Sequence, residues 1–199
     1  MRCHYCYNPD LVLRTAKSIS EEYVLSTLME RKKFIDAVVV TGGEPTIHSD
    51  LPDFLAKLKG LGFSVKLDTN GTNPQMLSAI ISKDLVDYVA MDVKAPWAKY
   101  RDVIGLDLDV EKIKSSMRII KESAPDYEFR TTAAPALTNA DLMEIAAQIS
   151  PAKRWFIQQF TSGPKILDPD ILKYPSLIWA EIEQVAKSQK TFTECSVRG

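Results

Sequence analysis

The sequence predicts an α/β fold built on a parallel sheet, and three observations support this. Short β-branched runs alternate with segments of helical periodicity, which is typical of parallel strands joined by right-handed helical crossovers. No linker-like stretch and no internal repeat interrupts the alternation. The length of 199 residues suits one domain with one buried core. We therefore expect a single domain over residues 1–199.

The first elements follow from the signals at their ends. Ser20 can cap a helix that carries one apolar stripe. The run 37–40 reads as a buried strand because it is β-branched and ends at two glycines. A second helix begins at Asp50 with a proline in its first turn, and Gly62 closes it. The next strand covers 64–67.

The later elements continue the alternation. Asp109 and Asn139 are predicted to cap two of the helices. The segment 161–199 is expected to form a C-terminal loop and a closing helix. The predicted order is helix 74–82, strand 86–91, a helix after Asp109, strand 127–132, helix 140–149, strand 155–160, loop 161–175 and helix 176–187.

Charge and composition argue against several classes of protein. The net charge is −1, whereas a general nucleic-acid binder needs an excess of Lys and Arg. No apolar run reaches the roughly 18 residues of a membrane span. Three cysteines are too few for a disulfide scaffold. The first residues lack the apolar region of a signal peptide, so we expect a cytoplasmic, thiol-reducing compartment.

Polar residues follow each predicted strand. Because a parallel sheet binds its ligands at the carboxyl ends of its strands, these residues predict a polar-ligand site on one rim. The alternative is that strand ends are simply where solvent begins. The segments concerned are 41–44, 68–70, 92–94, 130–132 and 158–159.

Cys3 and Cys6 form a Cys-x-x-Cys pair at the start of the chain. Two thiolates at this spacing can bind one metal ion or one iron–sulfur cluster. A zinc site would need two further ligands, for which His48 and Cys195 are the candidates. A thiol-redox pair is the third interpretation, although no strand is predicted before this one. We expect His48 to be an exposed loop residue and Cys195 a free surface or edge thiol.

The segment Gly42-Gly43-Glu44-Pro45 directly follows a predicted strand. Its glycines let the backbone approach a ligand closely, and their free N–H groups can meet an anion. Glu44 could accept a hydrogen bond from a ligand ammonium group, and Pro45 stiffens the turn. Taken alone, the segment also fits an ordinary strand-to-helix turn.

Taken together, the two motifs resemble the radical S-adenosylmethionine (SAM) superfamily. The sequences LDTNG at 67–71 and AMDVK at 90–94 extend the resemblance to the branch that activates glycyl radical enzymes. Within it, the chain is most similar to activating proteins of anaerobic ribonucleoside-triphosphate reductases, from residue 1 to about 160. The resemblance implies a partial (β/α) TIM-like barrel that lacks its first strand, a [4Fe–4S] cluster, and SAM.

By this resemblance, Cys3 and Cys6 match the second and third cluster cysteines. The first cysteine would lie four residues before Cys3, so we expect an N-terminally shortened chain that, as written, does not hold a stable cluster. A cluster-deficient, non-catalytic remnant is the alternative. The strand that ends at Thr41 is then expected to be an exposed edge, since the missing strand would have paired with it.

The resemblance also assigns the rim residues to SAM. Asp68 and Thr69 would help form a monovalent-cation site, and the glycine turn would contact the methionine amino group. Alternatives remain: a turn cap for Asp68, a solvated ion pair for Asp92 with Lys94, and pairing with a neighbouring strand for Arg130. The implied SAM-binding residues are Gly42, Gly43, Glu44, Pro45, Asp68, Thr69, Asp92, Lys94 and Arg130.

The implied activity is that of an oxidoreductase. It would cleave SAM reductively to a 5′-deoxyadenosyl radical and generate a glycyl radical on an anaerobic ribonucleotide reductase. Flavodoxin or ferredoxin would donate the electron, and neither nucleic acid nor a membrane is expected as a partner. The alternative enzyme is a radical SAM synthase that acts on a small molecule, of the deazapurine type.

Overall fold

A single curved sheet of six strands forms the centre of the molecule. The computed structural model describes residues 1, 3–13, 15–163 and 165–199. All neighbouring strands are parallel and follow one another in space as in the chain, which confirms the predicted fold class. The strands are β1 (Ala37–Val40), β2 (Ser64–Thr69), β3 (Tyr88–Asp92), β4 (Tyr127–Ala133), β5 (Ala152–Gln159) and β6 (Phe192–Arg198).

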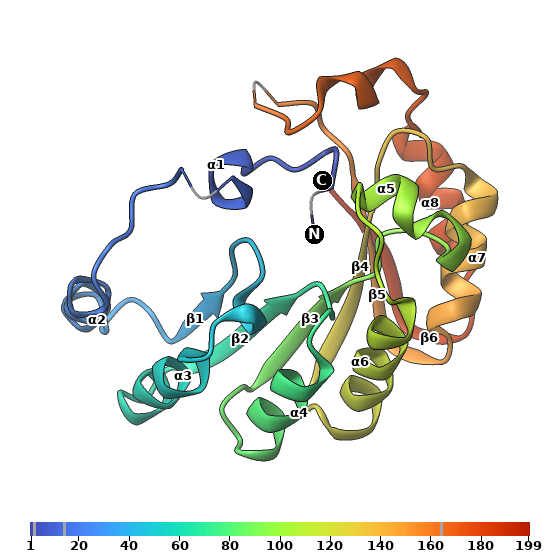
Figure 1. The fold of residues 1–199 in the computed structure, drawn as a ribbon. Helices are drawn as coiled ribbons and strands as arrows, with labels where there is room; N and C mark the ends of the chain where they lie inside the picture. Colours follow the sequence, from blue (N-terminus) through green and yellow to red (C-terminus); the bar gives the residue numbers. More distant parts are fainter. Residues whose placement is uncertain (2, 14, 164) are drawn as a thin grey trace.

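Helices follow the strands and cover the outer, convex side of the sheet, so that the whole is a partial (β/α) barrel (Figure 1). The N-terminal segment, with α1 and α2, instead arches beyond the open end of the sheet. The α-helices are α1 (Pro9–Val12), α2 (Glu21–Glu30), α3 (Leu51–Gly60), α4 (Pro74–Ser82), α5 (Tyr100–Ile104), α6 (Val110–Ser123), α7 (Asn139–Ile149) and α8 (Trp179–Ser188). Short 3-10 turns are η1 (Pro45–Ile47), η2 (Trp97–Lys99) and η3 (Pro169–Lys173).

Helix caps explain where the main helices begin. The side chains of Ser20 and Asp109 accept hydrogen bonds from the first turns of α2 and α6, as predicted. The prediction of Asn139 as a cap is wrong, because Thr138 forms a capping box with Asp141. This arrangement satisfies one more backbone donor than Asn139 alone would, and it starts α7 one residue earlier than expected.

The hydrophobic core lies between the sheet and its outer helices. Large side chains with no exposed surface come from both layers, including Leu67 of β2, Phe129 of β4 and Trp155 of β5. Burying one such side chain stabilises the fold by about 1.5–3 kcal/mol. The opposite, concave face of the sheet carries polar side chains, which it directs toward the site.

The C-terminal segment contains one strand more than predicted. After the loop and α8, residues Phe192–Arg198 form β6 and pair in parallel with β5, with Cys195 opposite Trp155. The expectation of only a loop and a closing helix over 161–199 is therefore incomplete. Polar residues interrupt the apolar pattern of this segment, so that pairing with β5 rather than local pattern defines it.

Strand β1 lies at the edge of the sheet. Among the described residues it pairs only with β2, and the Val39 side chain is 52% exposed. This agrees with the expected exposed edge. In the described part of the chain, no helix combines the length and the apolar composition that crossing a bilayer requires.

Candidate functional site

A cavity of about 220 Å³ lies at the carboxyl ends of the strands, under the N-terminal segment. The structure brings ten of the eleven predicted site residues to its wall, and these come from separate segments of the chain. These ten residues are Cys3, Cys6, Gly42, Gly43, Glu44, Asp68, Thr69, Asp92, Lys94 and Arg130. The exception is Pro45, which begins η1 and lines a neighbouring groove.

Residues 3–7, which we call the cysteine loop, form one wall of the cavity. Both thiols are free, Cys3 is 7% exposed, and the Cys6 amide donates to the Cys3 carbonyl at 3.0 Å. This turn places both cysteines against the same cavity. Burial raises the pKa of the Cys3 thiol, and the Lys94 ammonium partly opposes that rise.

The glycine turn after β1 forms the facing wall. Gly42 has φ of +140°, a conformation that side-chain-bearing residues rarely adopt. A Cβ atom at either Gly42 or Gly43 would meet nothing within 4 Å. The absence of side chains therefore keeps this wall open to a ligand.

Glu44 is bound by the protein rather than free for a ligand. It is 6% exposed and accepts from the Thr46 amide at 3.2 Å and from the Thr46 hydroxyl. It also accepts from the Thr69 hydroxyl and the Asn70 amide, both at 2.7 Å. The Glu44 carboxylate thus connects the glycine turn to the end of β2 and holds that turn in position.

A cluster of four charged residues forms the floor of the cavity. Arg130 donates to Asp92 and to Asp68, each at 2.9 Å, and Lys94 donates to Asp92 at 3.2 Å. Asp92 and Arg130 are direct partners in the β3–β4 register. Burial works to raise the pKa of Asp92, but the charges of Lys94 and Arg130 outweigh it and lower that pKa. The site is therefore charged at neutral pH.

This pairing bears on the expected monovalent cation. Asp68, the carboxylate that would help bind it, is already ion-paired with Arg130, and Lys66 lies 3.8 Å from Asp68. In the described part of the chain, no three His, Cys, Asp or Glu side chains gather as metal ligands. The arrangement therefore gives no support to a cation site.

Several residues of the cavity wall were not assigned a ligand role from the sequence. Tyr5 lies between the two cysteines, and its buried hydroxyl has no hydrogen-bond partner among the described atoms. Thr132 lies two residues after Arg130 on β4 and so shares its face of the sheet. Thr132 belongs to the predicted rim segment 130–132, and this period of two could have added it to the ligand-binding residues. Thr41 and Asn70 likewise belong to the predicted rim segments 41–44 and 68–70.

Other conspicuous residues lie outside this cavity. His48 is exposed and lines the neighbouring groove, as expected of a loop residue. Cys195 is free and half-buried on β6, and burial raises its pKa to about 12. Tyr100 is buried, and its hydroxyl accepts from the Lys94 amide at 3.2 Å.

The described residues fit part of what a [4Fe–4S] cluster needs and offer polar groups to the amino-acid part of SAM. Cys3 and Cys6 present two soft thiol ligands to the cavity, where the resemblance implies three. The open glycine wall and the charged floor suit a ligand that carries ammonium, carboxylate and hydroxyl groups.

Comparisons with known proteins agree with this geometry. The family model described as the radical SAM superfamily matches residues 1–149. A candidate glycyl-radical enzyme activating enzyme of Methanocaldococcus jannaschii is 33% identical over 201 residues, which cover 98% of this chain and 82% of the relative. A second candidate activating enzyme, from Haemophilus influenzae, is 39% identical over 75 residues, which cover 36% of this chain and 29% of the relative.

Solved structures share the fold. Streptococcus suis SuiB bound to its precursor peptide SuiA has a TM-score of 0.75 at 12% identity, covering 99% of this chain and 46% of that chain. A domain of pyruvate-formate lyase-activating enzyme from Bacteroides vulgatus has a TM-score of 0.64 at 15% identity, covering 82% and 99%. With the family model matching most of its length and a relative similar from end to end, the chain belongs to the radical SAM superfamily of enzymes.

Proposed function

We propose that this protein cleaves SAM reductively and generates a glycyl radical on a partner enzyme, an anaerobic ribonucleotide reductase. The observation that carries the proposal is the gathering of two free thiols, an open glycine wall and a charged floor around one cavity. The similarity to candidate glycyl-radical enzyme activating enzymes supports the choice of partner class.

Each part of the cavity has a proposed role. Cys3 and Cys6 would hold two irons of the cluster, and Gly42 and Gly43 would let the backbone meet the methionine part of SAM. Lys94 and Arg130 would orient the carboxylate of SAM, and both are already charged and fixed by Asp92. Preorganised charges of this kind cost no reorganisation when the ligand binds.

The bound cofactors would supply the hard chemistry: an electron from the reduced cluster would split SAM into methionine and a 5′-deoxyadenosyl radical, and transfer of one hydrogen atom from a glycine Cα to that radical would give 5′-deoxyadenosine and the glycyl radical. The protein's own contribution is to bind, to orient and to exclude water. We further propose that 1–199 forms one domain, works in the cytoplasm and accepts its electron from a flavodoxin or ferredoxin.

The test uses the full natural protein, reconstituted with iron and sulfide without oxygen and then reduced with dithionite. We expect SAM to be converted to methionine and 5′-deoxyadenosine, measured by chromatography. Cys6→Ser should abolish the products, whereas Cys195→Ser, remote from the cavity, should leave them unchanged. Equal product from both variants would refute the role of the cysteine loop.

The partner is tested separately with an anaerobic reductase whose glycines carry deuterium at Cα. We expect a protein-based radical in electron paramagnetic resonance spectra and one deuterium atom in the 5′-deoxyadenosine. SAM cleavage without either signal would exclude this partner and favour a small-molecule substrate.

A further inference from the structure

The segment after β5 contacts the cysteine loop through residues that do not line the cavity. Four of its residues touch the loop, and we call them the strap: Phe160, Thr161, Leu167 and Asp168. All four follow the last residue that the family model matches, residue 149. Sequence and family therefore leave the strap without any assigned role.

Backbone hydrogen bonds join the strap to the loop on both sides of Tyr5. The Asp168 amide donates to the His4 carbonyl at 3.0 Å, and the Leu167 amide donates to the Cys6 carbonyl at 3.1 Å. Because Cys6 in turn donates to Cys3, these bonds fix the turn that carries both thiols. The strap thereby acts on the thiols through the backbone next to them.

A side-chain pair closes the same contact. His4 Nδ1 lies 2.8 Å from Asp168 Oδ2, and the two side chains are 34% and 41% exposed. The other carboxylate oxygen of Asp168 accepts from the Asp170 amide at 3.0 Å, which begins η3. The Asp168 carboxylate thus contacts η3 through one oxygen and His4 of the cysteine loop through the other.

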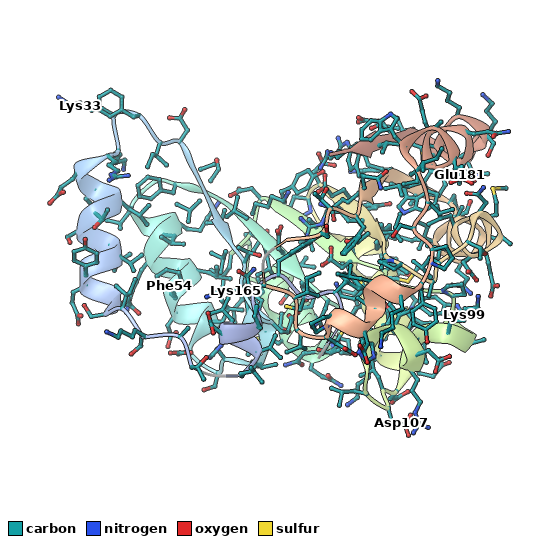
Figure 2. The ribbon with its side chains drawn as sticks, turned by 90° about the horizontal axis from the view of Figure 1, so that it is seen from above. Lys33, Phe54, Lys99, Asp107, Lys165 and Glu181 are labelled. Atoms are coloured by element: carbon teal, nitrogen blue, oxygen red, sulfur yellow. The ribbon has the colours of Figure 1, made fainter. Side chains whose placement is uncertain are left out.

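Aromatic packing supports the adjacent part of the loop. The rings of Tyr7 and Phe160 stack with centroids 5.9 Å apart, and Tyr5 meets Phe160 edge-on at 6.5 Å. The Thr161 amide donates to the Tyr7 hydroxyl at 3.0 Å. In the view from above in Figure 2, Lys165 lies over the centre of the molecule, and its ammonium lies 3.6 Å from Asp10 of α1.

We propose that Asp168 is a positioning residue for the cysteine loop: through His4 and the loop backbone, it keeps the Cys3 and Cys6 thiols directed at the cavity. This inference rests on the proposed function, in which the two thiols of the loop bind the cluster. Cys3 itself is buried, so it can react with a reagent only when the loop opens. Loosening the strap should raise its reactivity.

The experiment measures alkylation of each cysteine by iodoacetamide in the metal-free protein, read by mass spectrometry, with Cys195 as an internal reference. We expect Asp168→Ala to raise the ratio of the Cys3 rate to the Cys195 rate about two- to fivefold, as loss of one partly exposed side-chain contact predicts. Asp168→Asn keeps a carbonyl acceptor and should show a smaller rise. Asp170→Asn is the matched control on η3, since that carboxylate pairs only with Lys173 among the described residues, and it should show none.

Hydrogen exchange at the amides of 3–7 should rise in parallel in Asp168→Ala, while exchange at the amides of β3 and β4 stays as in the wild type. A Cys3 ratio equal to that of Asp170→Asn would overturn the proposal. A rise shared by Cys195 would overturn it too, because it would indicate general destabilisation. Since this assay needs neither cluster nor SAM, its outcome is independent of the test of the proposed function.

In the reconstituted natural protein, a further readout is the electron paramagnetic resonance spectrum of the reduced cluster. We expect Asp168→Ala to change it and Asp170→Asn to leave it as in the wild type. Identical spectra in all three proteins would refute positioning of the thiols by Asp168.

Discussion

Replacing Glu44 by glutamine tests whether its carboxylate holds the glycine turn against β2. One carboxylate oxygen accepts from Thr46 and from the Thr69 hydroxyl, and the other accepts from the Asn70 amide. Glutamine keeps one oxygen but puts an NH₂ group in place of the other. At least one donor, such as the Asn70 amide, then faces another donor.

The expected loss follows from the kind of contact that is removed. A hydrogen bond to a charged group contributes about 1.5–3 kcal/mol, and a buried donor left without a partner costs about 1–3 kcal/mol. Because both figures describe overlapping parts of one contact, we expect Glu44→Gln to lower the free energy of unfolding by about 2–4 kcal/mol. Glu111→Gln is the control, since the Glu111 side chain is 75% exposed, and it should change that energy by less than about 0.5 kcal/mol.

Urea unfolding followed by circular dichroism measures both variants. We expect the midpoint of Glu44→Gln to fall while the slope of the transition stays that of the wild type. A midpoint no lower than that of Glu111→Gln would refute the reasoning, because the buried carboxylate would then not hold the turn.

Three further predictions concern the scaffold around the site. Glu128→Ala should lower the free energy of unfolding by about 2–4 kcal/mol in the same assay, because the Glu128 side chain is 2% exposed and accepts from Lys66, Tyr88 and Arg198. Its control, Glu194→Ala on the exposed edge strand β6, should lower that energy by less than about 1 kcal/mol. Gly71→Ala should cost about 1–3 kcal/mol in thermal denaturation, because its φ is +74° and the new methyl group would meet Met91; a melting temperature equal to that of the wild type would argue against this. In urea titrations, the free energy of unfolding should stay constant above about pH 4 and fall below it. The reason is that, although burial raises the pKa of several carboxyls, hydrogen bonds from lysine or arginine outweigh it and lower that pKa in the folded state. As the pH falls, the unfolded state therefore binds protons first. Those carboxyls belong to Asp87, Asp126 and Asp141.

Local sequence pattern was sufficient to predict most strands of the sheet and to predict that the polar residues after them meet at one rim. Each of β1–β5 has either a run of apolar residues or apolar and polar residues in alternation, together with a nearby helix, and parallel topology brings their carboxyl ends to one rim. That is why residues as distant as Glu44 and Arg130 could be expected to meet, whereas Cys3, which follows no strand, was placed with them by the family resemblance. Strand β6 has neither pattern, since its apolar residues Phe192, Cys195 and Val197 are irregularly spaced, and its pairing with β5 defines it.

The contacts within the site could not be predicted in the same way. Glu44 was recognised as a site residue, but its engagement by Thr69 and Asn70 depends on the distance between two strands. The pairing of His4 with Asp168 joins residues at opposite ends of the chain, and no local pattern encodes it. Long-range geometry therefore decides which polar groups remain free for a ligand.

The affinity for SAM of the full natural protein with its cluster tests the central claim most directly, in the wild type, Gly43→Ala and Gly60→Ala. An added Cβ atom would meet nothing within 4 Å at either glycine, but only Gly43 lines the cavity. In isothermal titration calorimetry, we predict that Gly43→Ala weakens SAM binding about tenfold or more, since it fills space the ligand needs, and that Gly60→Ala binds as the wild type does. Equal affinity in all three proteins, or no binding by the wild type, would contradict the account.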